Sequence, residues 1–177
     1  IVQRSIGILT VILVVLIVAM MMIVSSIQGT ARIVNYAGLV RGKTQRIVKF
    51  EISGKQEDDM IQEIESFIDG LRNGNKELNL VRLDDSDFQA KMEELNEYFL
   101  MLKQEIMQVR VYGADKTQIL SKSEHFFEIC DEATGLAEAY SQRKASSLSV
   151  LEKYITADIV VLMLLIGYEF RSEEHTS

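Results

Sequence analysis

The sequence predicts an all-α protein, an antiparallel four-helix bundle flanked by transmembrane helices, the second of them truncated. The chain of 177 residues contains no proline, which loop-rich and all-β folds normally use in their turns. Charged residues are absent between Arg4 and Arg32 and dense from there to Asp158. In this charged region apolar residues recur at three- and four-residue spacing, as in amphipathic helices.

The first apolar run can cross a bilayer. Residues 6–24 contain only Ile, Leu, Val, Met, Ala, Gly and one Thr, and a helix rising ~1.5 Å per residue spans the ~30 Å hydrocarbon core with such a run. A cleaved signal peptide is the alternative, but its apolar region is usually about 7–15 residues long. We assign residues 1–27 to a first transmembrane helix in the lipid bilayer, with Arg4 on the cytoplasmic side.

The C-terminal end carries a second apolar run. Residues 159–168 are too few to span a membrane by themselves, so we expect residues 157–170 to be the start of a second transmembrane helix. Residues 171–177 resemble a translated sequencing adapter and predict a non-native tail. The natural sequence should therefore continue the apolar run past Phe170, and His175 receives no role.

Residues 28–156, between the two anchors, should form four helices. The first continues from the membrane run to about Ile52, where Ser53 and Gly54 break it. The second covers residues 57–72, with an acidic first turn that the helix dipole favours. The apolar stripe of the first helix consists of Ile33, Ala37, Val40, Thr44 and Ile47.

A loop over residues 73–84 should tuck in Leu78, Leu80 and Leu83 before the third helix. That helix should begin near Asp85, a capping residue, and end at Gly113. The fourth helix should begin at residues 115–117 and run without a breaker into the second apolar run. The predicted core contains Val40, Ile47, Ile64, Phe67, Leu95, Phe99, Leu102, Phe126 and Ala137.

Four amphipathic helices with short connections pack in an up-down-up-down bundle. An even number of helices returns the chain to the side of the membrane that it left, so both anchors should lie at one end of the bundle. We therefore expect a protein of the cell membrane with an extracytoplasmic central domain. A small slide or rotation of the first and last helices could then cross the bilayer.

Composition and motifs argue against several function classes. The net charge of −7 argues against nucleic acid as a partner, and the single Cys130 excludes an intramolecular disulfide and a multi-cysteine metal site. We expect no cofactor, and no pattern indicates an active site. His125 beside Glu124, Glu128 and Asp131 is a weak metal-site candidate that we interpret as a solvated face.

A second face of the first helix carries polar and small residues. Asn35, Gly38, Arg41 and Gln45 recur at three- or four-residue spacing opposite the apolar stripe. Glycine inside a helix costs about 1 kcal/mol relative to alanine, so Gly38 and the neighbouring Gly42 suggest that a helix or a ligand approaches closely. Arg41 and Gln45 lie one turn apart, and a guanidinium beside an amide and bare backbone suits a small planar anion.

The same residues also have a purely structural interpretation. Gly38 and Gly42 can permit close packing between helices, with Arg41 and Lys49 solvated at the rim. Residue chemistry by itself favours this interpretation, and both stay open at this point.

Residues 34–49 resemble the segment after the first membrane helix in nitrate/nitrite-sensor and type IV pilus chemoreceptor-like (PilJ-type) input domains. The resemblance implies a periplasmic four-helix bundle that dimerises through this helix. It also implies that Gly38 and Arg41 hold an anion such as nitrate or nitrite at the dimer interface. The chain departs from the pattern at Gly42, where these domains usually have methionine, and at the added Lys43. The pattern Asn-x-Ala-Gly-x-x-Arg, followed by Gln-Arg, is matched by Asn35, Ala37, Gly38, Arg41, Gln45 and Arg46.

These features lead to two function hypotheses. The first is a ligand-sensing input region of a bacterial transmembrane signal-transduction protein, acting as a homodimer. Its output region would be a histidine kinase, a diguanylate cyclase or a chemoreceptor signalling region, and the three stay open. The alternative is a membrane-anchored helical module for assembly or protein contacts without a small-molecule ligand. An ectoenzyme is a remote third class.

Overall fold

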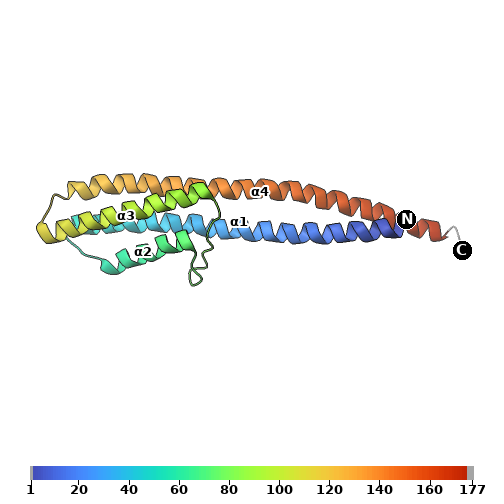
Figure 1. The fold of residues 1–177 in the computed structure, drawn as a ribbon, viewed down its shortest axis with the longest axis horizontal. Helices are drawn as coiled ribbons and strands as arrows, with labels where there is room; N and C mark the ends of the chain where they lie inside the picture. The colour runs from blue at the N-terminus through green and yellow to red at the C-terminus, as the bar shows by residue number, and fades with distance from the viewer. Residues whose placement is uncertain (1, 175–177) are drawn as a thin grey trace. The chain divides into compact units, whose positions relative to one another are not determined.

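The computed structural model describes residues 2–174, which form four α-helices: α1 (Val2–Ile52), α2 (Asp58–Asn73), α3 (Ser86–Tyr112) and α4 (Thr117–Glu174) (Figure 1). Within these residues there is no β-strand, and an isolated antiparallel bridge joins Asn75 to Leu80. The predictions of an all-α fold and of four helices are confirmed, with helix ends within about two residues of those expected.

The chain divides into two compact units. The bundle unit is Gly29–Ser141, and the apolar unit combines Ile1–Gln28 with Gln142–Ser177. Because α1 and α4 each contribute to both units, the bundle holds the second part of α1, all of α2 and α3, and the first part of α4.

In the bundle unit, helices that follow one another in the chain are neighbours, and α4 returns to α1. Each neighbouring pair shares at least one side-chain contact. The pairs are α1–α2 through Tyr36 and Phe67 (ring centroids 5.0 Å apart), α2–α3 through Arg72 and Glu93 (2.6 Å), α3–α4 through Phe99 and Phe126 (5.7 Å) and α4–α1 through Asp131 and Arg41 (2.9 Å). This arrangement confirms that the four helices pack as a bundle.

The core lies where the apolar spacing placed it. All nine residues predicted for the core are buried, and so is the α1 stripe, including the polar Thr44. The Thr44 hydroxyl donates a 2.8 Å hydrogen bond to the Val40 carbonyl oxygen within its own helix, so its burial leaves no orphaned polar group.

The connection between α2 and α3 folds back onto α2. Two backbone hydrogen bonds of 2.8 Å join Asn75 and Leu80. A Cβ atom at Gly70 would lie 3.0 Å from Leu80 Cδ1 and 3.2 Å from Asn75 Cβ, so glycine fits here without displacing the connection. Leu80 and Leu83 are buried and Leu78 packs against the core. The prediction that the leucines of this loop contribute to the core is confirmed.

Capping residues define where α3 begins and ends and where α4 begins. The Asp85 carboxylate accepts a 3.0 Å hydrogen bond from the Phe88 N–H at the start of α3. Gly113, with φ 64°, ends α3 in the left-handed conformation.

The segment before α4 is also held by hydrogen bonds. The Asp115 carboxylate accepts hydrogen bonds from the hydroxyl and the N–H of Thr117, which lower the pKa of Asp115. Lys116 Nζ donates a 2.8 Å hydrogen bond to the Ile52 carbonyl oxygen at the end of α1.

An ion cluster joins three helices, with Glu51 and Arg110 nearly buried and Asp58 exposed at its edge. Arg110 of α3 donates from Nε to Glu51 Oε2 of α1 at 3.0 Å and from Nη1 to Asp58 Oδ1 of α2 at 2.6 Å. Glu51 is only 4% exposed, and its hydrogen bonds are the largest cause of the raised pKa of Arg110. Helical spacing does not predict this cluster, because its three residues come from three separate helices.

The apolar unit contains the part of α1 that can cross a membrane. Among the described residues, α1 alone has the necessary length and composition, with a mean hydropathy of 3.2 in its most apolar stretch, none of which is buried. Because Asp158 and Glu169 border the short apolar run of α4 at residues 159–168, the second membrane helix from residue 157 stays a prediction. α4 continues to Glu174, and residues 175–177 of the expected tail lie outside the described residues.

The less exposed positions of α4 in the apolar unit follow a heptad pattern, with alternating steps of three and four residues. Asp158 occupies one of these positions. It is 8% exposed, and within the described residues its Oδ2 atom has no hydrogen-bond partner. The other positions are Lys144, Leu148, Leu151, Ile155, Leu162, Leu165 and Glu169.

Candidate functional site

The residues predicted to bind a ligand all lie on α1 in the bundle unit, away from its buried stripe. Asn35 and Gly38 are exposed, whereas Arg41 and Gln45 are half-buried. A helix advances about 100° per residue, so Asn35 and Gly38 face outward and Arg41 lies at the border between the outer and buried faces. The helix thus places the four on one side, with Arg41 nearest to the rest of the bundle.

The glycines of this face are not used for packing within the chain. A Cβ atom built on Gly38 or on Gly42 would meet no heavy atom within 4 Å. The interpretation that they admit a neighbouring helix of the same chain therefore fails. Their backbone is exposed at the surface of the bundle, where it can be approached from outside the chain.

Arg41 rests against α4. Its Nε lies 2.9 Å from Asp131 Oδ1, and its ζ carbon lies 5.5 Å from the centre of the Phe127 ring. Phe127 and Asp131 are one helical turn apart and therefore share a face of α4. The Arg41 side chain keeps 38% exposure and that of Asp131 keeps 62%, so the contact lies at the surface.

The contact between Arg41 and Asp131 is one of charge without an aligned hydrogen bond. The Nε atom is buried, yet among the described residues it has no hydrogen-bond partner, because its N–H does not point at the nearby carboxylate oxygen. Exposed ion pairs contribute about 0.2–1 kcal/mol. Arg41 is therefore paired with an opposite charge through a contact that contributes little to stability.

The other cations of the motif are held differently. Lys43 Nζ lies 2.7 Å from Glu63 Oε2 of α2 and 5.9 Å from the centre of the Phe67 ring. Arg46 is exposed, and its ζ carbon lies 5.3 Å from the centre of the Phe50 ring on the same helix. Lys43 thus belongs to the α1–α2 contact, and Arg46 serves as a control for Arg41.

The weaker candidates of the sequence behave as surface or core groups. His125 Nδ1 lies 3.1 Å from Glu128 Oε2, and the His125 ring packs edge-on against Tyr98. No group of three or more potential metal ligands occurs among the described residues. Cys130 is buried, and burial, with a smaller effect of the Asp131 charge, raises its pKa to about 12, which leaves it a protonated, unreactive thiol.

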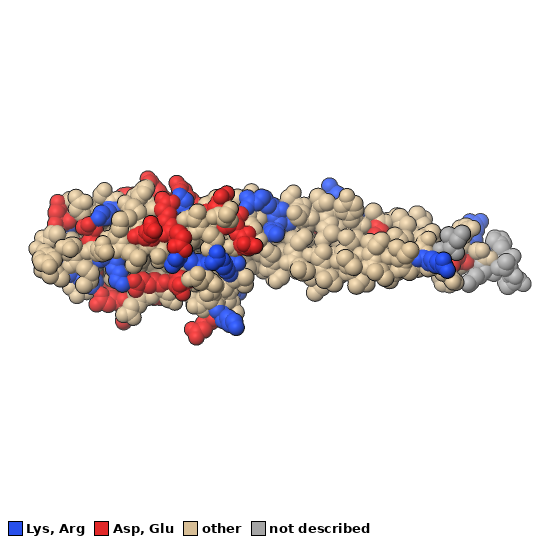
Figure 2. Space-filling model, in the orientation of Figure 1, with Lys and Arg blue, Asp and Glu red and all other residues tan. Residues whose placement is uncertain are grey.

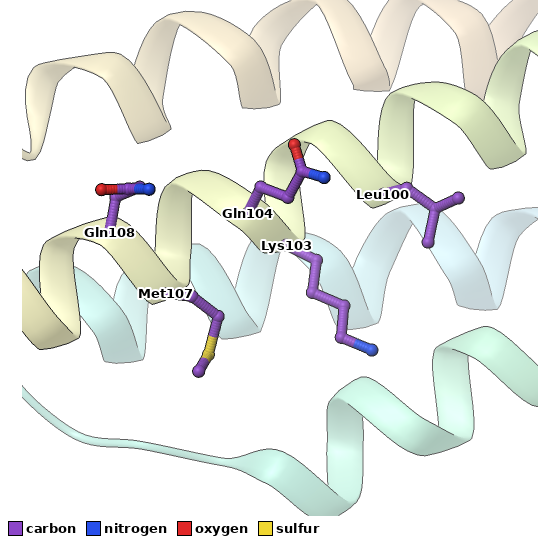
Figure 3. A pocket seen from close by; sticks show the side chains of 5 residues that line it. All are labelled: Leu100, Lys103, Gln104, Met107 and Gln108. Carbon is purple, nitrogen blue, oxygen red and sulfur yellow. The ribbon is translucent and has the colours of Figure 1, made fainter.

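A hollow on the surface of α3 is not a convincing alternative site. It measures about 390 Å³ and is lined by Leu100, Lys103, Gln104, Met107 and Gln108, all from α3. Figure 3 shows that Lys103 and Met107 point to one side of the helix and Gln104 and Gln108 to the other. Because Lys103 is paired with Glu65 of α2 at 2.5 Å and the side chains do not converge, the hollow offers no set of groups for a small polar ligand.

Both signs of charge are mixed over the bundle, as Figure 2 shows, so no large field of one sign covers the face that it presents. Several of these charges bridge neighbouring helices, including Lys91, which lies 2.6 Å from Glu132. Long-range attraction of a charged ligand to this face is therefore weak, because the charges alternate.

The fold is similar to that of a receptor domain of known structure. The ligand-binding domain of the P. aeruginosa nitrate receptor McpN matches with a TM-score of 0.56 and 17% sequence identity, over 62% of this chain and 96% of that domain. At this identity the similarity concerns the fold. No model of a protein family and no curated protein sequence matches the chain.

Proposed function

We propose that the chain is the extracytoplasmic ligand-sensing input region of a bacterial transmembrane signal-transduction protein. In this proposal the bundle unit binds a small anion, with nitrate and nitrite as the first candidates, on the outer face of α1. The output region, whether a histidine kinase, a diguanylate cyclase or a chemoreceptor signalling region, lies outside this sequence.

One observation carries the proposal. Arg41 stands beside two glycines whose backbone meets nothing within 4 Å in the chain. Helix-interior glycine is costly, so two of them beside a surface arginine favour a close approach from outside. The receptor-like fold and the motif in residues 34–49 support the same interpretation.

The proposed site forms between two copies of the chain. If two α1 helices meet around Gly38, the two Arg41 side chains converge, and in the empty state they repel each other to the extent that Asp131 leaves their charge uncompensated. A small anion between them removes the repulsion and accepts charge-assisted hydrogen bonds from both guanidinium groups. The ligand then favours one arrangement of the dimer over another, which is the requirement for a signal.

The alternative function is a helical module without a ligand. The pairing of Arg41 with Asp131 favours it, because a purely structural arginine would make this kind of contact between helices. In that case the exposed face of α1 would mediate protein contacts alone, and no anion would affect its stability.

A thermal-shift measurement on the full chain in lipid nanodiscs distinguishes the two. Nitrate, nitrite, chloride and sulfate are compared at constant ionic strength for the wild type, Arg41→Ala and Arg46→Ala. A ligand at 100 times its Kd stabilises by about 2.7 kcal/mol, which raises Tm by about 5 °C or more at this chain length.

We expect nitrate or nitrite to stabilise the wild type and Arg46→Ala and to have no effect on Arg41→Ala. Because Arg46→Ala removes the same charge from the same helix, it controls for a general electrostatic effect. An equal response of all three proteins, or none from the wild type, would rule out the anion-sensor function in favour of the helical module.

A further inference from the structure

A carboxylate of the chain itself contacts the arginine of the proposed site. Asp131 Oδ1 lies 2.9 Å from Arg41 Nε, so a carboxylate of the chain itself occupies one edge of the guanidinium group that the proposed ligand needs. Phe127, one turn before Asp131, supports the same guanidinium group at 5.5 Å from its ring centre. Together they hold Arg41 against α4.

We propose that Asp131 is an intramolecular competitor of the ligand, which holds Arg41 against α4 in the empty state and yields it when an anion binds. This inference rests on the proposed function and assigns a regulatory residue to the same site. The structure supports it because Nε is buried without a hydrogen-bond partner among the described residues, despite the short contact with Asp131. An incoming anion that draws the side chain away from Asp131 can align with this Nε–H, which Asp131 leaves unsatisfied.

Competition of this kind has a direct consequence for helix packing. Arg41 is on α1 and Asp131 on α4, the two helices that continue beyond the bundle unit. When an anion draws Arg41 away from Asp131, it removes a contact between α1 and α4. Asp131 therefore reduces the affinity of Arg41 for the ligand. Because such coupling acts equally in both directions, the bound ligand weakens the contact between α1 and α4.

The size of the effect follows from the exposure of the pair. Exposed ion pairs shift an equilibrium by roughly 1.4-fold to 5-fold. If an anion engages two Arg41 side chains, the effects multiply, and removal of the competitor should tighten binding by about tenfold. Loss of Asp131 should not unfold the bundle, because its side chain is 62% exposed.

The test is calorimetric titration of sodium nitrate into the full chain in nanodiscs at constant ionic strength. The variants are Asp131→Asn, which removes the charge, and Asp131→Glu, which keeps it. The matched control is Glu124→Gln, since Glu124 is exposed and lies two turns before Asp131 on the same face of α4. This control changes the net charge equally without touching Arg41.

We expect Asp131→Asn to bind nitrate about tenfold more tightly than the wild type, with Asp131→Glu and Glu124→Gln within about twofold of the wild type. Binding by Asp131→Asn where the wild type shows none would also support the competitor. Equal affinity of the wild type and Asp131→Asn, or equal tightening by Glu124→Gln, would overturn the competitor while leaving the anion sensor intact. An absence of binding in every variant would overturn both.

Discussion

Two arginines of the bundle show how burial changes the role of an ion pair. Arg110 and Glu51 have side chains that are 10% and 3% exposed, and two hydrogen bonds join them. Arg72 and Glu93 make a bidentate contact at 2.6–3.1 Å, but the Glu93 side chain is 57% exposed. Removing one partner leaves a buried charge in the first case and a hydrated one in the second.

This difference predicts unequal losses of stability. Arg110→Ala should lower the free energy of unfolding by about 3–5 kcal/mol, because the Glu51 carboxylate would stay buried without its partner. Arg72→Ala should cost about 1 kcal/mol or less. Urea unfolding of both variants in nanodiscs, followed by the helical signal in circular dichroism, measures the two values. Similar losses would show that Glu51 is solvated or paired elsewhere.

At the scale of elements, α1 combines a buried stripe with an open face. The stripe packs in the core, while Gly38 and Gly42 on the opposite side meet nothing in the chain. Gly135 on α4 also has no heavy atom within 4 Å of a built Cβ. The bundle itself therefore tolerates a side chain at any of these glycines, and only an external partner would distinguish them.

Leucine substitutions separate the bundle from its proposed dimer. Gly38→Leu should keep the helical content and Tm of the bundle, because the side chain enters open space, yet it should abolish dimerisation by blocking the approach of the second α1. Gly135→Leu is the matched control and should leave the dimer intact. Light scattering of both variants in detergent gives the oligomeric state, and a dimeric Gly38→Leu protein would exclude this interface.

The helix positions and the core could be predicted from the sequence, whereas the polar contacts between helices could not. Apolar spacing placed the helices and the core, since residues such as Val40 and Phe126 repeat with the helical period. It could not find the pair of Glu51 and Arg110, which are separated by 59 positions and meet only once the register of α1 against α3 is set. The partner of Arg41 was missed for the same reason, because helical period does not determine which turn of α4 faces α1.

For the whole molecule, the proposed function links a site on α1 to the two helices that continue beyond the bundle unit. The apolar unit contains a buried carboxylate, Asp158, at a heptad position between the apolar Ile155 and Leu162. A polar group at such a position lowers the stability of one register and can help to specify another. A ligand that changes the α1–α4 contact then needs only a modest difference in affinity to shift the population.

The most direct test of this account is the stoichiometry of anion binding. Calorimetric titration of nitrate into the full wild-type chain in nanodiscs should give one nitrate for two chains, because each anion lies between two Arg41 side chains. The same titration of Arg41→Ala should show no binding heat. One nitrate per chain, or unchanged binding by Arg41→Ala, would contradict a site shared between two α1 helices.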